Sequence, residues 1–544
     1  MTWADHLVIA PIVIPLLAGG SMLMFEGRRR EVIASINVLA TLAQLAVAIA
    51  LLVGSLQESP AQVVKVYLLG DWPAEFGIVL VADQLAALML VLTALLACAA
   101  LLYSLAYWHR AGSYFHPLFQ FLLMGLNGAF LTGDLFNLFV FFEVLLAASY
   151  GLALHGSGRA RVRASLHYIV VNLAASSLFL IGVSAIYGTA GTLNMAELGQ
   201  RIPELNASER GLFEIGAAIL GIAFLVKAAA WPLGFWLPPL YAAASAPVGA
   251  VFAVLTKVGV YIILRLGSIT PDAGGGGLFF AEGWLFVIGI ATISFAAIAM
   301  LASQDMGHLA GYSVLVSSGT LLATIGLGGP EMTSSALFYL VTSTLTIATF
   351  FLLIEIVERG RTPADDVLAV TLEVYGAEDE EDPETAEEAG IAVPAILGVL
   401  GVAFLACGLM LAGLPPLAGF VAKFAILDSL LDRHWLTVGG TVSVQGWLLL
   451  LVILVSGLTT IIAVARAGIR TFWAFPDREL PRVAAVELGA LGLLLFLCIA
   501  LTVQAGPVMK FMQQTAIGLE AGRAYIGAVK AQSPVTPPQT GKAP

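Results

Sequence analysis

Charged residues are scarce in this chain. Asp, Glu, Lys and Arg together make up only 11% of the sequence, whereas hydrophobic residues make up 59%. Soluble domains carry roughly 25% charged residues, so this composition excludes an ordinary soluble enzyme or binding module. Long apolar runs recur from one end to the other, and about 20 such residues are enough to cross a bilayer. We therefore predict one large all-α polytopic membrane protein.

Cysteine and cofactor motifs are almost missing as well. The three cysteines, Cys98, Cys407 and Cys498, lie in apolar segments without the spacing of metal ligands, so we interpret them as small buried hydrophobic residues. The sequence has no CxxC or CxxCH motif, which argues against an iron–sulfur or haem centre. It also has no GxxxxGK[ST] motif, which argues against ATP as the energy source. We expect no metal, no cofactor and no nucleic-acid partner.

Acidic residues are concentrated in one run, residues 373–388 (EVYGAEDEEDPETAEE), within a predicted loop over 358–390. Its low hydrophobicity and high charge are typical of a disordered segment. The alternatives are a solvated insert without chemistry and a docking patch for a basic partner.

The apolar runs predict about fourteen spans. They cover residues 7–25, 32–55, 79–107, 116–132, 135–153, 165–187, 212–230, 247–267, 283–302, 309–327, 332–357, 391–431 (broken, counted once), 445–466 and 484–504. Asp5 precedes the first span and no basic segment does, so we expect a retained helix and not a cleaved signal peptide.

Basic residues between the spans predict the orientation, because cytoplasmic loops are rich in Lys and Arg. With the N-terminus outside, the inner loops hold thirteen basic residues: Arg28, Arg29, Arg30, Arg110, Arg159, Arg161, Arg163, Arg359, Arg361, Arg466, Arg470, Arg478 and Arg482. The outer loops then hold five: Lys65, Arg201, Arg210, Arg265 and Arg433. We therefore predict that both termini lie outside, and that the polar tail over 505–544 is partly disordered.

Four charged residues fall near the middle of predicted spans: Glu143, Lys227, Lys257 and Lys423. A charge at that depth costs at least about 3 kcal/mol, and such residues usually mark ion or proton pathways. Glu143 is about 12 Å deep at 1.5 Å of helix rise per residue, and Lys257 is too deep to reach the surface with its side chain. Together they predict a path for protons or cations. The alternatives are a structural glutamate and permanent helix–helix ion pairs.

Two spans contain prolines that interrupt a helix. Pro232, Pro238 and Pro239 follow Lys227, whereas Pro415 and Pro416 precede Lys423. Interrupted segments at matching places in two halves indicate inverted repeats and a functional site, and the mirrored order of lysine and break fits that pattern. The alternative is two unrelated kinks.

Other polar residues lie at span edges. His308 could relay protons near neutral pH or could cap its helix, and Asp305 beside it is a candidate cap. Asp83 and Asp134 could guard an entrance or could be solvated. Glu355 is expected at the membrane interface, and Tyr150 and Tyr312 are expected to be packing residues, although Tyr312 and Asp134 are also possible relay members.

Four sequence blocks then resemble a known family: FNLFVFFEVLLAASYGL, FLVKAAAWPLGFWLPPLYAAASAPVGAVFAVLTKVGVYIILR, QDMGHLAGYS and GLPPLAGFVAKF. They are similar to the antiporter-like subunits of respiratory complex I and of Mrp-type cation/proton antiporters, most of all to the D-type subunit of the Mrp antiporters. The resemblance runs from about residue 80 to 470, with its motifs in the family's order.

The resemblance implies fourteen helices and two inverted five-helix repeats with broken seventh and twelfth helices. The chain would divide into 1–110 (helices 1–3), 111–270 (first repeat), 271–475 (second repeat) and 476–544 (helix 14 and the tail). By matching motif, Glu143 takes the place of the helix-five glutamate, and Lys227, Lys257 and Lys423 take those of the lysines of helices seven, eight and twelve.

The chain also departs from the family. Gly307 and His308 stand where members usually carry two basic residues, and Ser317 and Thr342 stand where many carry larger polar or basic side chains. A central relay would here have to run through hydroxyls and water. Lys423 argues against the M-type subunit of complex I, which usually has glutamate there, and the short polar tail argues against the L-type subunit.

We therefore expect a transporter subunit, not an enzyme, in a bacterial plasma-membrane complex that exchanges H⁺ for Na⁺ or another monovalent cation. Its expected partners are other membrane subunits and the lipid bilayer. Alternatives are a proton-pumping subunit of a complex I-like oxidoreductase or membrane-bound hydrogenase, a non-transporting scaffold and a stand-alone carrier. Neighbouring genes and copurifying subunits would distinguish the first alternative.

Overall fold

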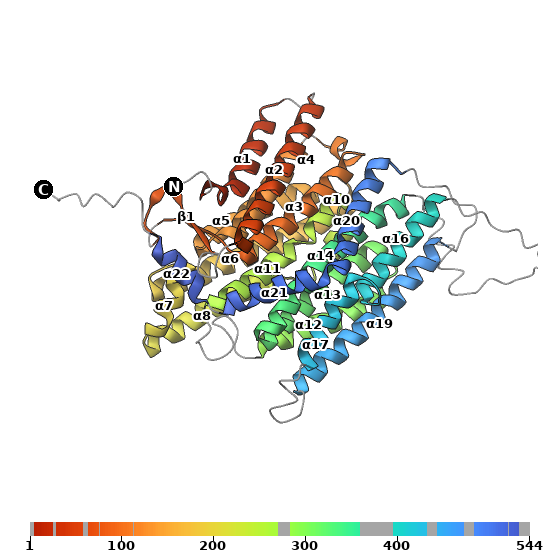
Figure 1. Cartoon of the computed structure of the whole chain (residues 1–544). Helices are drawn as coiled ribbons and strands as arrows, with labels where there is room; N and C mark the ends of the chain where they lie inside the picture. Colours follow the sequence, from red (N-terminus) through yellow and green to blue (C-terminus); the bar gives the residue numbers. More distant parts are fainter. Residues whose placement is uncertain are drawn as a thin grey trace, which may run out of the picture.

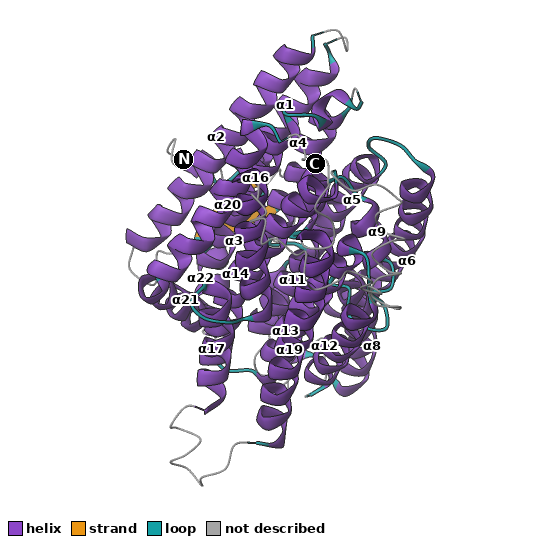
Figure 2. Ribbon diagram, turned by 90° about the vertical axis from the view of Figure 1, so that its right-hand side faces the viewer, coloured by secondary structure: helices purple, strands orange, loops and turns teal. Residues whose placement is uncertain are grey.

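Helix makes up nearly all of the described chain (Figure 2). The computed structural model describes residues 5–25, 29–57, 64–74, 77–112, 114–269, 283–359, 395–431, 443–472, 483–520 and 522–532. The acidic run 373–388, Arg28, Arg361, Arg433, Arg478, Arg482 and the end of the tail lie outside the described residues.

The helices lie alongside one another, from the N-terminal helices at one side of the bundle to those of residues 395–472 at the other, and the last two helices return toward the N-terminal side (Figure 1). Their bounds are α1 Ala10–Leu23, α2 Arg30–Gln57, α3 Gln84–Ser104, α4 Phe115–Leu131, α5 Leu135–Ala153, α6 Arg159–Ala190, α7 Met195–Arg201, α8 Ala207–Lys227, α9 Leu237–Ala243, α10 Ala246–Phe252, α11 Leu255–Ile269, α12 Trp284–Ala302, α13 Met306–Leu327, α14 Pro330–Glu358, α16 Ala395–Ala412, α17 Ala418–Leu431, α19 Val444–Phe472, α20 Ala485–Val503, α21 Ala505–Glu520 and α22 Arg523–Ala531. Among the described residues, 11 segments are long and apolar enough to cross a membrane, and α1 and α4 are shorter apolar helices. Every predicted span corresponds to a helix or a pair of helices.

One prediction needs correction at the edge of the bundle. Residues 79–82 are not helical: they form strand β2 (Val79–Ala82), which pairs antiparallel with β1 (Lys65–Leu68). Val79 to Ala82 are all buried, and the backbone of this strand also bonds to Gly133, so it belongs to the core of one end. The prediction of a partly disordered tail stays a prediction, because the end of the tail lies outside the described residues. In its described part, α21 packs on α14 and α11, and α22 packs on α7 and β1 (Figure 1).

Both proline-containing spans are broken, as predicted. α8 ends at Lys227, and Ala229 takes a left-handed conformation (φ 55°) before Pro232. α16 ends at Ala412, and Gly413 takes the same left-handed conformation (φ 78°) before Pro415 and Pro416. In each case the residue after the left-handed one, Ala230 or Leu414, donates its N–H to a carbonyl five residues back. This is the bond that closes a Schellman motif. Pro238 and Pro239 do not break a helix; they lie in the first turn of α9, where a missing N–H costs little.

A third interruption was not predicted. The span over 247–267 is two helices, α10 and α11, separated by Ala253 and Val254. The N–H groups of Val254 and Lys257 bond to carbonyls three residues back, so the chain tightens locally into a 3₁₀ turn. Lys257 therefore lies in the first turn of α11, next to a break, as Lys227 lies at the end of α8.

Arg110, Arg161 and Arg359 lie at one end of the bundle, the arginine-rich end, and Glu355 on α14 joins several segments there. Its carboxylate accepts hydrogen bonds from the Trp108 indole (2.8 Å) and from the Ala246 backbone N–H (2.8 Å), and it pairs with Arg359. Arg359 also pairs with Glu487 of α20. The sequence indicated an interfacial position for Glu355 but gave no sign that it joins α14 to the segment around Trp108 and to α10, and through Arg359 to α20.

Candidate functional site

The four charges predicted at mid-span lie on α5, α8, α11 and α17, and the three lysines are buried. Lys227 is 8% exposed, Lys257 0% and Lys423 6%, and Glu143 is half-buried. Among the described residues, no ion pair involves any of the four. The alternative of permanent ion pairs therefore finds no support, and each charge is held by neutral groups.

Glu143 and Lys227 are both bound to α6. Ser176 donates its hydroxyl to Glu143 Oε1 (2.5 Å), and Lys227 Nζ donates to Asn172 Oδ1 (3.0 Å). Asn172 and Ser176 are four residues apart, so they lie on one face of α6 in successive turns. The Asn172 amide nitrogen donates to the Tyr168 carbonyl (2.9 Å), which turns its oxygen toward the lysine. The Phe142 ring also faces the ammonium, at 5.6 Å.

Lys257 begins a short chain of hydroxyls. Its Nζ donates to Ser317 Oγ on α13 (2.7 Å), and Ser317 is hydrogen-bonded to Ser343 on α14 (2.8 Å). Ser317 is one of the positions where the family resemblance led us to expect a larger polar side chain. Here the smaller hydroxyl fills that place and still provides the acceptor that a buried ammonium requires.

Lys423 is bound by the end of the broken helix. Its Nζ donates to the carbonyls of Leu411 (3.1 Å) and Ala412 (2.9 Å), which the end of α16 leaves without helical partners. A Cβ at Gly413 would lie 2.4 Å from Lys423 Cδ. Glycine is therefore required at position 413 for two reasons. Its φ is left-handed, and any side chain there would clash with the aliphatic part of the Lys423 side chain.

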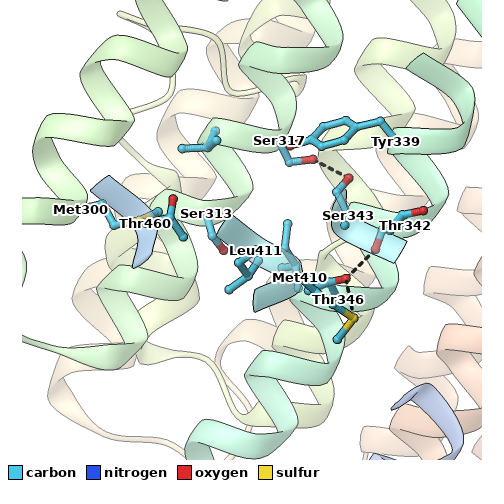
Figure 3. Close-up of a pocket in the computed structure, with 13 residues that line it drawn as sticks. Met300, Ser313, Ser317, Tyr339, Thr342, Ser343, Thr346, Met410, Leu411 and Thr460 are labelled. Atoms are coloured by element: carbon cyan, nitrogen blue, oxygen red, sulfur yellow. Dashed lines mark hydrogen bonds between the residues drawn. The ribbon is translucent and has the colours of Figure 1, made fainter. Parts of the chain in front are cut away.

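A small cavity is bordered both by Ser317, which binds Lys257, and by Leu411, which binds Lys423 (Figure 3). Its volume is about 20 Å³, and its walls come from α12, α13, α14, α16, α17 and α19. Ser317 and Leu411, the acceptors of the two lysines, both border it. We call it the hydroxyl-lined cavity, after Ser313, Ser317, Thr342, Ser343, Thr346 and Thr460.

The structure places the possible relay residues away from these lysine contacts. His308 lies in the first turn of α13, where its Nδ1 contacts Asp305 Oδ2 (2.6 Å), and its side chain is 42% exposed. Asp305 caps α13, as the sequence suggested. Tyr312 is a half-buried packing residue. Asp134 caps α5 by accepting from the Asn137 N–H (2.8 Å), and burial raises the pKa of its carboxyl.

Sequence reasoning misplaced Asp83 and Arg265. Asp83 caps α3, and it forms a two-bond ion pair with Arg265, a residue predicted in an outer loop but found inside α11 and 3% exposed. Burial opposes ionisation of Asp83, but the charge and hydrogen bonds of Arg265 outweigh it and hold the pKa of Asp83 below its usual value. The pair borders a cavity of about 480 Å³ between α3, α11, α21 and α22.

The acceptors of the lysines were also missed, although a signal was present. Asn172 and Ser176 are polar residues four apart in an apolar span, which is the spacing of a shared helix face. Nothing in the sequence pairs them with Lys227 and Glu143 on other helices.

The family model described as NADH:quinone oxidoreductase/Mrp antiporter, TM, matches residues 132–449. This range holds all four charges and both broken helices. The chain belongs to this family. It is 55% identical over 526 residues to the D-type subunit of a probable K⁺/H⁺ antiporter from Rhizobium meliloti, covering 95% of this chain and 96% of that one. It is 32% identical over 533 residues to the D-type subunit of the Na⁺/H⁺ antiporter from Alkalihalophilus pseudofirmus, covering 96% and 99%.

A solved structure agrees with these relatives. A chain of the Mrp complex from Dietzia sp. superimposes with a TM-score of 0.79 at 26% identity, covering 97% of this chain and 100% of that one. The predicted resemblance to the D-type subunit of the Mrp antiporters is therefore confirmed, and so is the predicted all-α polytopic fold.

Proposed function

We propose that this chain conducts protons as a subunit of a multisubunit antiporter, which exchanges H⁺ for a monovalent cation across a bacterial plasma membrane. The observation that carries the proposal is the set of three buried lysines, each bonded to a neutral acceptor and each beside a break in its span. Buried charges of this kind are costly and usually functional. The names of the two relatives favour antiport, one with K⁺ and one with Na⁺.

A neutral acceptor suits a lysine that must change its charge. An ion pair would hold the ammonium form, because the carboxylate would lose its partner if the lysine gave up its proton. Asn172, Ser317 and the α16 carbonyls can bind an N–H of either the ammonium or the amine. The proton can therefore leave without creating an unpaired buried charge.

Glu143 provides the switch in this mechanism. Bound to Ser176, its carboxylate leaves the Lys227 ammonium without an ion pair in an apolar setting, which favours release of the proton. Moved toward Lys227, it favours proton uptake. The released proton passes through hydrated side chains toward Lys257, and then through Ser317, Ser343 and the hydroxyl-lined cavity toward Lys423.

The arrangement in the membrane is part of the proposal. The distribution of basic residues favours an orientation with both termini outside and the 358–390 loop in the cytoplasm. Residues 111–270 and 271–475 form the two repeats, with Lys227 and Lys257 in the first and Lys423 in the second. Other membrane subunits complete the complex, with Na⁺ or K⁺ as the exchanged ion.

The test is dissipation of ΔpH by Na⁺ or K⁺ in inverted vesicles from a host that lacks its own antiporters. The full gene cluster would carry the wild-type chain, Glu143→Ala or Lys227→Ala, with assembly checked by blotting. Loss of exchange in a complex that still assembles is the expected result. Exchange that persists in both variants would favour the scaffold function, and no exchange from the wild type would favour a redox-driven assembly.

A further inference from the structure

Lys257 shares one face of α11 with Tyr261 and Arg265. The three buried residues are four positions apart, so they lie in successive turns of the helix. They lead from the Lys257 site toward the end of the bundle that carries the strands, where Arg265 meets Asp83 beside β2. Eight residues of helix rise about 12 Å, so the turn of Tyr261 is what separates Lys257 from Arg265 on this face.

Arg265 lies between Tyr261 and the cavity of about 480 Å³ described above. Its guanidinium donates to Asp83 Oδ1 (2.7 Å) and to the Tyr261 hydroxyl (3.0 Å), and the rings of Tyr261 and Tyr525 flank it at 5.3 and 5.2 Å. A cavity of this size has room for several water molecules. Among the described residues, Arg265 borders it and Tyr261 does not. We call it the outer cavity; its polar border includes Ser55, Asp83, Gln84, Arg265, Thr515 and Tyr525.

Arg265 interrupts any hydrogen-bonded route between the outer cavity and Lys257. The Tyr261 hydroxyl donates its proton to the Phe130 carbonyl (2.6 Å) and accepts a hydrogen bond from Arg265. A proton moves along hydrogen bonds only if each member can accept a proton and give one up. A guanidinium has donors and no acceptor, and it keeps its proton in proteins. Arg265 therefore cannot pass a proton from the water of the outer cavity to Tyr261.

The charge of Arg265 acts in the same direction. A fixed arginine charge forms an electrostatic barrier that excludes protons and cations from a pore. A buried guanidinium without a partner would itself be costly, and Asp83 removes that cost with a two-bond ion pair. The pair thus combines a group that blocks protons with the counter-charge that holds this group in place.

We propose that Tyr261, Arg265 and Asp83 form a barrier that insulates Lys257 from the outer cavity and so prevents protons from leaking across the membrane without exchange. The inference rests on the proposed function, in which Lys257 carries protons and the strand-bearing end of the bundle faces outside. A proton that passed between Lys257 and the outer cavity would bypass Lys423 and would move no cation. The barrier therefore serves the coupling of the two ions, not proton transfer itself.

The experiment is the decay of an imposed pH gradient in proteoliposomes that contain the purified complex but neither Na⁺ nor K⁺, with a lipophilic ion present to compensate charge. Asp83→Asn combined with Arg265→Met removes the barrier and leaves no unpaired buried charge. Glu197→Gln combined with Arg201→Met is the matched control. It removes an ion pair on α7, which packs on α22 at the same end, and neither residue borders the outer cavity among the described residues. Thermal unfolding of each complex shows whether the variants remain folded.

The expected result is that the pH gradient decays at least about tenfold faster with Asp83→Asn/Arg265→Met than with the wild type, because water from the outer cavity then reaches the Tyr261 hydroxyl. Adding Lys257→Met should return the decay to the wild-type rate, since the leak passes through Lys257. The control pair should stay as tight as the wild type. A tight Asp83→Asn/Arg265→Met complex, or a leak that persists without Lys257, would overturn the proposal.

Arg265→Lys decides the question if Asp83→Asn/Arg265→Met does not assemble. It keeps a positive partner for Asp83, but a buried lysine can release its proton whereas an arginine cannot. The shorter side chain also leaves room for water beside Tyr261. We expect the pH gradient to decay faster with Arg265→Lys than with the wild type, and decay at the wild-type rate would contradict the barrier.

These outcomes are separate from the test of proton conduction, because the leak is measured without an exchanged cation. If Glu143→Ala and Lys227→Ala leave exchange intact while Asp83→Asn/Arg265→Met leaks through Lys257, the proposed switch is wrong and the barrier stands. If Glu143→Ala and Lys227→Ala abolish exchange while the barrier variants stay tight, the switch stands and the barrier is wrong.

Discussion

At the scale of single residues, the main feature is that small neutral groups hold the buried lysines. Ser317 is the clearest case, because it is the one side chain that contacts Lys257 Nζ through a hydrogen bond among the described residues. Removing one partner of a buried charged group costs about 1–3 kcal/mol or more. A cost of this size in the proton-transfer step corresponds to a loss of roughly tenfold or more in rate.

We therefore expect Ser317→Ala to lower exchange in vesicles by about tenfold or more while the complex still assembles. The adjacent Ser318→Ala is the control, since the Ser318 hydroxyl is buried and has no hydrogen-bond partner among the described residues. Its removal should leave exchange near the wild-type rate. Equal rates for Ser317→Ala and the wild type would exclude Ser317 from the path.

The single charges could be found from sequence because an ionisable residue stands out in an apolar span. Glu143, Lys227, Lys257 and Lys423 needed no structure for that reason. Their partners could not be found in the same way, because serine, threonine and asparagine are common in such helices and bond to their own backbone, as Thr342 and Thr346 do. Which hydroxyl meets which lysine depends on packing between helices far apart in the chain.

At the scale of helices, the breaks were predictable where proline marks them and were missed where it does not. Pro232 and Pro415 signalled the interruptions after α8 and α16, but nothing in Phe252–Leu255 announces the turn between α10 and α11. The helical interpretation of 79–82 failed for a related reason: a short apolar run fits a buried strand as well as a helix. The pairing of β2 with β1 decided between them.

The Asp83–Arg265 pair joins α3 to α11, and it gives a prediction about stability. Removing one partner of a buried pair typically costs 3–5 kcal/mol, so Asp83→Asn should lower the thermal unfolding temperature of the complex. Asp83→Asn combined with Arg265→Met should recover much of the loss, because it leaves no unpaired charge. Additive losses in the double variant would contradict a direct pair.

The Asp83–Arg265 pair also determines how the stability of the folded chain depends on pH. The folded-state pKa of Asp83 is lowered from 3.8, so its contribution to stability is complete above the unfolded value and is lost only as the pH falls through the lower folded value. Between about pH 5 and pH 8, the destabilisation caused by Asp83→Asn should be constant. A destabilisation that changes across this window would mean that the pair titrates there.

At the scale of the whole molecule, the orientation of the bundle can be tested directly. Tyr114 precedes α4 at the arginine-rich end and is 66% exposed, whereas Trp72 lies beside the strands at the opposite end and is 63% exposed. With both termini outside, an impermeant maleimide should label Trp72→Cys in intact cells and Tyr114→Cys only in inverted vesicles. The reverse pattern would invert the orientation. The buried Cys407 and Cys498 should give little background.

Composition and hydropathy were sufficient for the class and for the approximate positions of the long helices, because a bilayer demands long apolar helices. The correction to Arg265 shows where this reasoning stops. As a charged residue near a span end it was counted with the loops, but the structure places it inside α11 with Asp83 as its partner. Hydropathy cannot detect a charge that is neutralised by a residue 182 positions away in the sequence.

The central claim is that the buried lysines are successive links in one proton path, and Lys257 tests it most directly because it lies between the other two. The measurement is proton flux driven by a Na⁺ or K⁺ gradient in proteoliposomes that contain the purified complex, with wild type, Lys257→Met and Lys510→Met. Lys510 is an exposed lysine on α21 and serves as the control. We predict that Lys257→Met abolishes the flux while Lys510→Met preserves it. Undiminished flux through the Lys257→Met complex would contradict the account.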